Sequence, residues 1–338
     1  MPEKIRVLIA DDSSLMREAI KAILESDPDI EVIGMAKDGQ EAIDKALALK
    51  PTVITMDMNM PKKNGIEAIE EIMRSVPTPI IVISTMNVNV IIKALGIGAM
   101  DFVCITHDIS VVKKDLLAKV KISSRVKAIR RMKIGPFSPK VIPAQHKTTS
   151  KIIAIGVSTG GPQALETVLA GIPSDFPAGI AVVQHISEGF INGLAEWLGT
   201  TSGLEVKVAR SGDVLKKGTV LLAPDKYNFT LNGEGVVILK EPVSQKAVQQ
   251  IPSIDELMCS VAASYGDRAV GVIMTGMSSD GVKGIREIKH AGGITISQDE
   301  KSSVIFGMNK LAIETGCVDR VIPLDRIAKE LIELAASV

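Results

Sequence analysis

The chain has 338 residues, enough for two domains of ordinary size, and its formal net charge is zero. The neutral balance gives no bulk attraction to nucleic acid, and an aromatic content of 3% leaves few rings to stack on bases. The cysteines are three and far apart, no apolar run approaches the roughly 18 residues of a bilayer span, and no signal peptide is recognisable. We therefore expect a cytoplasmic protein with no disulfide framework and no membrane insertion.

The first 120 residues alternate short apolar runs with amphipathic segments. The apolar runs predict five strands, at 5–10, 31–36, 53–56, 80–83 and 102–104. The amphipathic segments between them predict helices at 15–24, 40–49, 66–73 and 90–95. This alternation predicts a parallel, doubly wound (βα)5 sheet whose site lies at the C-terminal ends of its strands.

Polar side chains that could bind a cation or a phosphoryl group follow these strands; they are Asp11, Asp12, Asp57 and Ser84. Carboxylates at one sheet edge repel one another, and Mg²⁺ would relieve this, with the backbone carbonyl of Asn59 and waters as further ligands. An aspartate beside bound Mg²⁺ can attack a phosphoryl donor. Alternatively, Asp11 or Asp12 only caps the helix that begins near Ser13, which would not explain Asp57 or Ser84.

These segments resemble the receiver domain of bacterial response regulators. The matching motifs are VLIADDSSLMR, ITMDMNMPKKNG, IVIST and GAMDFV. The resemblance implies that Asp57 is the phospho-acceptor and that Asp11 and Asp12 hold Mg²⁺. It also implies that Ser84 is the switch hydroxyl and Phe102 the switch aromatic residue.

One position departs from the receiver pattern. The family places a lysine, usually followed by proline, after the fifth strand, where this chain has Ile105 and Thr106. Isoleucine cannot pair with phosphoryl oxygens as lysine does. Either a nearby cation compensates, for which Lys62 and Lys63 are candidates, or this receiver is weakly coupled to phosphorylation.

A basic linker is expected over residues 121–149. The segment 116–150 contains many Lys and Arg residues and no acidic residue, and its second half contains Pro and Ser. The plainest interpretation is a solvated helix face followed by a tether. Docking against an acidic partner is a second interpretation. DNA binding is a third, but no helix-turn-helix pattern follows, so we expect no DNA partner.

Residues 150–338 form a second α/β pattern. Strands are expected at 152–157, 179–184, 204–209, 219–223, 236–239, 269–274 and 294–297. Helices are expected at 162–171, 190–199, 253–264, 281–291 and 323–336. An Asn-Gly-Glu-Gly sequence within 227–239 indicates a β-hairpin. The pattern predicts a doubly wound domain with a mostly parallel sheet and one hairpin.

Ser158 and Thr159 lie where the strand 152–157 passes through a Gly-Gly-Pro turn into a helix. A hydroxyl group there lies beside exposed backbone N–H groups and a helix N-terminus. The turn could cradle a phosphate, or Ser158 could be a nucleophile on a sharp turn. This stretch alone leaves both interpretations open.

Two further strand ends carry residues that could assist a serine nucleophile. His185 follows the strand 179–184, and Asp280 follows the strand 269–274. Taken separately, His185 could be a core histidine and Asp280 an N-cap. Together with Ser158 they would bring a serine, a histidine and an aspartate to one sheet edge, as a catalytic triad requires. The phosphate interpretation weakens, because no lysine follows the Gly pair and no GxGxxG is present.

At these residues the whole chain resembles the bacterial chemotaxis protein-glutamate methylesterases, the CheB family. The motifs are IGVSTGG, VVQHISEGF, APD, IPSIDELMCSVA, VGVIMTGMSSDGVKG, TISQDEKSSVIFGM and AIETGCVD. The resemblance implies that Ser158 is the nucleophile, His185 the base and Asp280 its orienting partner. It also implies that Met277 offers a backbone oxyanion donor and that Thr159 lies beside the nucleophile.

Two positions in this half depart from the family. The family often has His where this chain has Asn228, which would alter substrate contacts, and it often has Pro in the place of Asn309, which we expect to be a local change.

The resemblance implies a receiver over 1–120, the linker over 121–149 and a methylesterase domain over 150–338. The enzyme would demethylate glutamate methyl esters, and deamidate glutamines, on methyl-accepting chemotaxis receptors. A chemotaxis histidine kinase would phosphorylate its receiver with Mg²⁺ as cofactor, and the esterase would need none. The alternatives are an interaction protein with a vestigial site, which the intact Ser, His and Asp motifs disfavour, and a DNA-binding response regulator.

Overall fold

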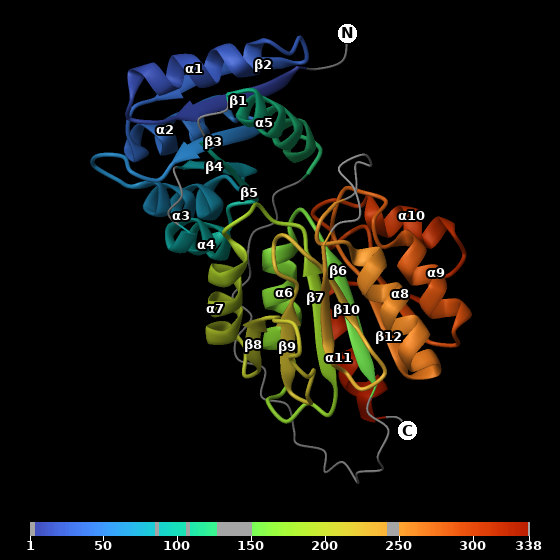
Figure 1. The fold of residues 1–338 in the computed structure, drawn as a ribbon. Helices are drawn as coiled ribbons and strands as arrows, with labels where there is room; N and C mark the ends of the chain where they lie inside the picture. Colours follow the sequence, from blue (N-terminus) through green and yellow to red (C-terminus); the bar gives the residue numbers. More distant parts are fainter. Residues whose placement is uncertain (1–3, 85–87, 106–108, 127–150, 242–249, 337–338) are drawn as a thin grey trace. The chain divides into compact units, whose positions relative to one another are not determined.

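The computed structural model describes residues 4–84, 88–105, 109–126, 151–241 and 250–336. The chain divides into two compact units, residues 1–134 and 135–338, which are described separately (Figure 1). Most of the expected basic linker, residues 121–149, lies outside the described residues. None of the described helices combines the length and the apolar character needed to cross a membrane.

The first unit is a five-stranded parallel sheet in the order β2-β1-β3-β4-β5. Its strands are β1 (Ile5–Ala10), β2 (Ile30–Ala36), β3 (Val53–Asp57), β4 (Ile80–Ser84) and β5 (Asp101–Cys104). Its helices are α1 (Ser14–Glu25), α2 (Gly39–Leu49), α3 (Gly65–Ser75), α4 (Val88–Ile97) and α5 (Ile109–Ser123). The predicted (βα)5 doubly wound fold is confirmed.

The core of this unit covers both faces of its inner strand β1. Val7 and Ile9 of β1 are fully buried and pack in one cluster with Leu24 of α1 and with Leu116 and Val120 of α5. Leu8, between them, is also fully buried, so both faces of β1 are covered, as expected of a parallel strand. The carboxylates Asp11, Asp12 and Asp57 consequently lie at the ends of their strands.

The second unit contains a seven-stranded sheet in the order β14-β13-β12-β6-β7-β9-β8, with every pair parallel. Its strands are β6 (Ile152–Val157), β7 (Gly179–Gln184), β8 (Glu205–Val208), β9 (Thr219–Leu222), β12 (Ala269–Ile273), β13 (Ile294–Gln298) and β14 (Arg320–Ile322). The predicted hairpin is present as a separate antiparallel pair, β10 (Asn228–Leu231) and β11 (Val237–Lys240).

Helices cover both faces of this sheet (Figure 1). They are α6 (Gly161–Ala170), α7 (Ile191–Thr201), α8 (Ile254–Tyr265), α9 (Val282–His290), α10 (Met308–Glu314) and α11 (Leu324–Ala336), with a short 3-10 helix at Gly266–Arg268. Neither α10 nor the edge strand β14 was predicted. Both are short, and no side chain caps the N-terminus of α10.

The strand order changes direction at β6, because β7 lies on one side of it and β12 on the other. Binding sites of open α/β sheets lie at such a switch point, outside the C-terminal strand ends. The helix α8 packs close to β6 here, since a Cβ added to Gly156 would lie only 2.2 Å from Cγ2 of Ile254. The glycine thus brings the first turn of α8 to the end of β6.

Candidate active site

Ser158 follows β6 in a tight turn that leads into α6. Its N–H donates to the Thr275 carbonyl at 3.0 Å, and its carbonyl accepts from the Gly161 N–H at 2.8 Å. Gly160 between them has a φ of +76°, which favours glycine. A Cβ added to Gly276 would lie 2.6 Å from the Ser158 Cβ, so this glycine lets the segment after β12 approach the serine closely.

The chain after β7 lies beside this turn. The His185 N–H donates to the Val157 carbonyl at 3.0 Å, which places His185 alongside the end of β6. The Gln184 Nε2 joins the two segments, because it donates to the carbonyls of Ser158 at 2.9 Å and of His185 at 2.7 Å. Ser158 and His185 therefore follow neighbouring strands, β6 and β7, whose ends are joined by hydrogen bonds.

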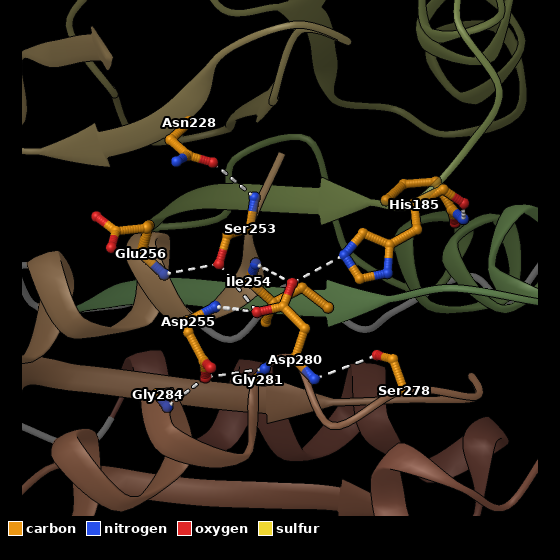
Figure 2. Close-up of polar contacts among 11 residues, drawn as sticks. His185, Asn228, Ser253, Ile254, Asp255, Glu256, Ser278, Asp280, Gly281 and Gly284 are labelled. Carbon is orange, nitrogen blue, oxygen red and sulfur yellow. Dashed lines mark hydrogen bonds and ion pairs between the residues drawn. The ribbon is translucent and has the colours of Figure 1, made fainter. Parts of the chain in front are cut away.

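The structure brings His185 and Asp280 into hydrogen-bond contact (Figure 2). His185 Nε2 lies 2.9 Å from Asp280 Oδ2, and the side chains are 9% and 11% exposed. A carboxylate only accepts, so Nε2 carries the proton and Nδ1 keeps its lone pair. Nδ1 is buried and has no hydrogen-bond partner within the described residues. This nitrogen is thus available to take a proton.

Asp280 accepts four hydrogen bonds, two on each oxygen. Oδ2 accepts from His185 and from the Ile254 N–H at 2.7 Å, and Oδ1 accepts from the Ser253 Oγ at 2.9 Å and the Asp255 N–H at 3.0 Å. Burial opposes its charge, but the bonds from His185 and from the Asp255 and Ile254 N–H groups outweigh burial and lower the pKa of Asp280. Asp280 is therefore ionised at neutral pH.

Asp280 does not cap the helix that follows it in the chain. The N-cap of α9 is Gly281, whereas the Asp280 carboxylate lies at the N-terminus of α8. A helix N-terminus stabilises a negative charge through its free N–H groups and its dipole. The sequence suggested that Asp280 could cap the helix after it, but its carboxylate instead accepts from the first N–H groups of α8.

Among the backbone N–H groups near Ser158, those of Thr159 and Met277 have no hydrogen-bond partner in the described parts of the chain. Thr159 is held through its carbonyl, which accepts from the Thr275 Oγ1 at 2.9 Å. Met277 is 52% exposed, and its thioether has no hydrogen to donate, so any role in an oxyanion hole falls to its backbone. Free N–H donors at this edge are what an oxyanion hole requires.

Several residues that support this site are not recognisable from the sequence. The Ser253 hydroxyl and the first N–H groups of α8 hold Asp280, and the buried Gln298 accepts from the Thr275 N–H at 2.9 Å. One local signal existed, because the spacing Ser253-x-x-Glu256 is typical of a helix N-terminus. Nothing local indicates that the same serine contacts a residue 27 positions later.

The two departures from the family pattern are both buried. Asn228, on β10, is 5% exposed, and its Oδ1 accepts from the Ser253 N–H at 3.0 Å. It therefore supports the segment before α8, and its amide is turned to the backbone. Asn309 is fully buried, and its Nδ2 donates to the Gln298 carbonyl at 2.9 Å, which joins α10 to the end of β13.

In the first unit, the predicted acidic residues gather at the strand ends. Burial, together with the charges of Asp57 and Asp12, raises the pKa of Asp11 to about 6. Burial, with a contribution from Asp12, also raises the pKa of Asp57. Ser13, not an aspartate, caps α1, and its N–H donates to Asp11 Oδ1 at 2.9 Å.

Carboxylates whose ionisation is opposed in this way fit a divalent cation, which would relieve their repulsion. The Asn59 N–H donates to Asp57 Oδ2 at 3.0 Å and keeps that residue beside the carboxylate. Across the described residues, no three His, Cys, Asp or Glu side chains converge enough to hold a metal alone. A backbone carbonyl and waters would therefore have to complete the Mg²⁺ site.

Ile105, where receivers have lysine, packs against the hydrophobic core of the first unit. Its N–H donates to the Ser84 carbonyl at 3.1 Å, and Ser84 is buried. The candidate Lys62 is 2.6 Å from the buried Asp38, so in this structure it is paired away from Asp57. Lys63 has its carbonyl bonded to the Gly39 N–H.

Phe102 is 3% exposed, and the Lys119 ammonium lies 5.1 Å from its ring centroid. Lys119 also pairs with Asp115 at 3.1 Å and Asp101 at 3.4 Å, and Asp101 begins β5, at the opposite end of that strand from Ile105. Lys119 is thus not a substitute for the missing lysine.

Two family models match the chain. The CheB methylesterase model matches residues 153–331, and the response regulator receiver domain model matches residues 7–114. The first spans the candidate triad, and the second spans the acidic cluster.

Curated relatives match over nearly the full length. A protein of Anaeromyxobacter dehalogenans named protein-glutamate methylesterase/protein-glutamine glutaminase 2 is 42% identical over 334 residues, covering 98% of this chain and 97% of its own. A protein-glutamate methylesterase/protein-glutamine glutaminase of Thermotoga maritima is 40% identical, with 98% of both chains covered.

A solved structure resembles the second unit. The crystal structure of the Thermotoga maritima CheB methylesterase catalytic domain is 40% identical, with a TM-score of 0.53, and the match covers 55% of this chain and 100% of that one. The chain therefore belongs to the CheB methylesterase family, as a member that also carries a response regulator receiver domain.

Proposed function

We propose that this protein is a phosphorylation-regulated hydrolase that removes methyl esters from glutamate side chains of methyl-accepting chemotaxis receptors. Glutamine deamidation would proceed through the same acyl-enzyme. One observation carries the proposal: the His185 imidazole is bonded to Asp280 through Nε2, while its buried Nδ1 has no partner in the described structure and lies on the strand end next to that of Ser158.

In this mechanism Ser158 Oγ attacks the ester carbonyl and passes its proton to His185 Nδ1. The Thr159 and Met277 N–H groups donate to the oxyanion of the tetrahedral intermediate. The intermediate collapses, and the imidazolium returns the proton to the departing methoxide, which leaves as methanol. Water then attacks the acyl-enzyme by the reverse sequence and releases the free glutamate and Ser158. An amide substrate would release ammonia instead.

Asp280 supports the charged step of this cycle. When His185 takes the proton, the imidazolium forms against an ionised carboxylate at 2.9 Å. The carboxylate also fixes which nitrogen carries the resting proton, so that the lone pair remains on Nδ1. Its own charge is held by the Ser253 hydroxyl and by the Ile254 and Asp255 N–H groups.

Regulation is assigned to the first unit, with Asp57 as the phospho-acceptor and a chemotaxis histidine kinase as the donor. Asp11, Asp12, Asp57 and the Asn59 carbonyl would hold Mg²⁺, which supplies positive charge against the carboxylates and the incoming phosphoryl oxygens. Phosphorylation shifts an equilibrium only by its differential interaction with two states. Because Ile105 offers the phosphoryl group no ion pair, we expect a smaller shift than a lysine would give.

The test is methanol release from methylated receptor by the full chain and by Ser158→Ala. We expect the substitution to lower kcat by roughly 10⁶-fold, as in other serine triads. Ser211, an exposed serine after β8, provides the matched control, because β7 and β9 separate β8 from β6 in the sheet. Methanol release by Ser158→Ala at the wild-type rate would eliminate the proposal.

A further inference from the structure

The Asp280 carboxylate is held by one short stretch of chain, residues 253–255, in addition to its bond with His185 (Figure 2). Two of the three donors in this stretch are backbone N–H groups, those of Ile254 and Asp255. The third is the hydroxyl of Ser253, which is therefore the only one that a substitution can remove among these described contacts. It bonds to Oδ1, the oxygen that faces away from the histidine.

Ser253 is itself fixed from two directions. Its N–H donates to Oδ1 of Asn228 at 3.0 Å, and its Oγ accepts from the Glu256 N–H at 3.3 Å as the N-cap of α8. Ser253 and Asn228 are 2% and 5% exposed, so water does not compete for these bonds. The hydroxyl has one proton, and it is directed at Asp280, 2.9 Å away.

The backbone that carries Asp280 is held by the same stretch. Asp255 Oδ1 accepts from the Gly281 N–H at 2.9 Å and from the Gly284 N–H at 2.7 Å, at the N-terminus of α9. Asp255 of α8 thus lies at the start of α9, and Asp280, just before α9, lies at the start of α8 (Figure 2). With its backbone fixed, Asp280 can move only by rotation of its carboxylate, and the Ile254 and Asp255 N–H groups and the Ser253 hydroxyl together oppose that rotation.

We propose that Ser253 is a positioning residue for the esterase reaction, with Asn228 holding Ser253 in place. The hydroxyl bond on Oδ1 acts with the Ile254 and Asp255 N–H groups to fix the plane of the carboxylate. Oδ2 therefore stays on His185 Nε2, and Nδ1 stays directed for proton transfer. This inference rests on the proposed function of the same site, but its spectroscopic test below does not depend on turnover.

The expected effect follows from losing one donor to a charged acceptor. Such a loss should lower kcat by about 10- to 100-fold. KM should stay within about twofold, because Ser253 is buried and touches no substrate. A purely structural role for Ser253 as a helix cap predicts lower stability without this loss of kcat in the folded protein.

The experiment compares Ser253→Ala, Ser253→Gly and Ser253→Thr in the full chain. Glycine is nearly as good an N-cap as serine, so Ser253→Gly removes the hydroxyl while α8 keeps its start. Threonine restores a hydroxyl. Ser260→Ala is the matched control, because Ser260 lies on the same helix and its hydroxyl bonds the Leu231 N–H and the Leu257 carbonyl, not Asp280.

The second readout is the His185 Nε2–H proton, observed by NMR with ¹⁵N-labelled histidine and assigned with His185→Asn. We expect a low-field, exchange-protected resonance in the wild type and in Ser260→Ala. Its protection should be lost in Ser253→Gly and Ser253→Ala and recovered in Ser253→Thr. Unchanged kcat together with an unchanged resonance in a folded Ser253→Gly would overturn the proposal.

Two further outcomes are decisive. If Ser253→Ala acts only through Asp280, it should add no further loss of kcat in the Asp280→Ala background; an equal loss in both backgrounds would overturn the proposal. If the wild type releases no methanol from the receptor, the proposed function fails. The resonance in Ser253→Gly then still decides whether the serine holds the Asp280–His185 pair.

Discussion

Asparagine in place of Asp280 would test the orienting role of the carboxylate with little change in shape. The aspartate accepts on both oxygens, whereas asparagine accepts on one side and donates from the other. If its amino group faces Ser253 and Asp255, the hydroxyl can turn to accept, but the Asp255 N–H meets a donor. If it faces His185, the imidazole must carry its proton on Nδ1, and this nitrogen can no longer act as a base toward Ser158.

Either orientation leaves one buried backbone N–H of α8 facing a donor, which costs about 1–3 kcal/mol. The lost negative charge at a helix N-terminus adds about 0.3–1 kcal/mol. We therefore expect the free energy of unfolding of the second unit to fall by about 1–4 kcal/mol. Catalysis should fall further, by about 10⁴ in kcat, because the wrong imidazole tautomer is favoured and the imidazolium loses its counter-charge.

The stability loss should depend on pH in a defined direction. Burial opposes the charge, but the bonds from His185 and the α8 N–H groups hold the pKa of Asp280 below its ordinary value of 3.8. The stabilisation from the ionised Asp280 is thus fully present above the pKa of this residue in the unfolded chain. It is lost as the pH falls through the lower pKa of the folded protein. The difference between wild type and Asp280→Asn should accordingly narrow in acid.

Methanol release gives kcat, and the fluorescence of Trp197 follows urea unfolding of the second unit, because this is the only tryptophan in the sequence and lies on α7. The control is Asp267→Asn, an exposed aspartate in the same unit. If Asp280→Asn released methanol within tenfold of the wild type, the assignment of Asp280 as the orienting acid would be refuted.

Three further changes probe the remaining features. Ile105→Lys should raise the stimulation of methanol release by a small phosphodonor several-fold, because lysine can pair with phosphoryl oxygens on Asp57. Asp11→Asn should stabilise the first unit by about 1–3 kcal/mol at pH 7 without Mg²⁺, since the pKa of Asp11 is raised to about 6. Gly276→Ala should lower kcat by about 10²-fold, because a Cβ would lie 2.6 Å from the Ser158 Cβ.

Each of these has its own control. Asp57→Asn should abolish the gained stimulation, and a large stimulation in the wild type would instead refute weak coupling. Neutral asparagine mimics the protonated acid, so the gain in unfolding free energy from Asp11→Asn should vanish as the pH falls from 6 toward 3.8. Unfolding is followed by circular dichroism, and a gain that stays constant with pH would contradict the prediction. Gly199→Ala, whose added Cβ would meet nothing closer than 3.8 Å, should leave kcat unchanged.

The sequence predicted the architecture well, because most strands are continuous apolar runs and most helices have regular amphipathic spacing. It missed α10 and β14, which have seven and three residues and carry little periodicity. His185 and Asp280 could be selected because parallel strand ends converge on one edge. Ser253 could not, because its bond to Asp280 depends on how α8 and α9 pack, which no local pattern encodes.

The same limit explains Asn228, which we expected to alter substrate contacts. Asn228 is buried, and its Oδ1 accepts from the backbone N–H of Ser253, a contact that no local pattern encodes. Likewise, the sequence alone indicates that Ile105 stands where receivers have a charged lysine. Its packing against the core of the first unit emerges only from the folded arrangement.

The hairpin β10–β11 lies outside the seven-stranded sheet, yet its two ends differ in what they tolerate. At its tip, a Cβ added to Gly233 meets nothing within 4 Å, and Tyr265 anchors the turn through the Asn232 carbonyl at 2.9 Å. At its base, Asn228 is bonded to the segment that holds Asp280. The tip is thus a site where a label or inserted peptide can be attached without loss of turnover, while the base allows little variation.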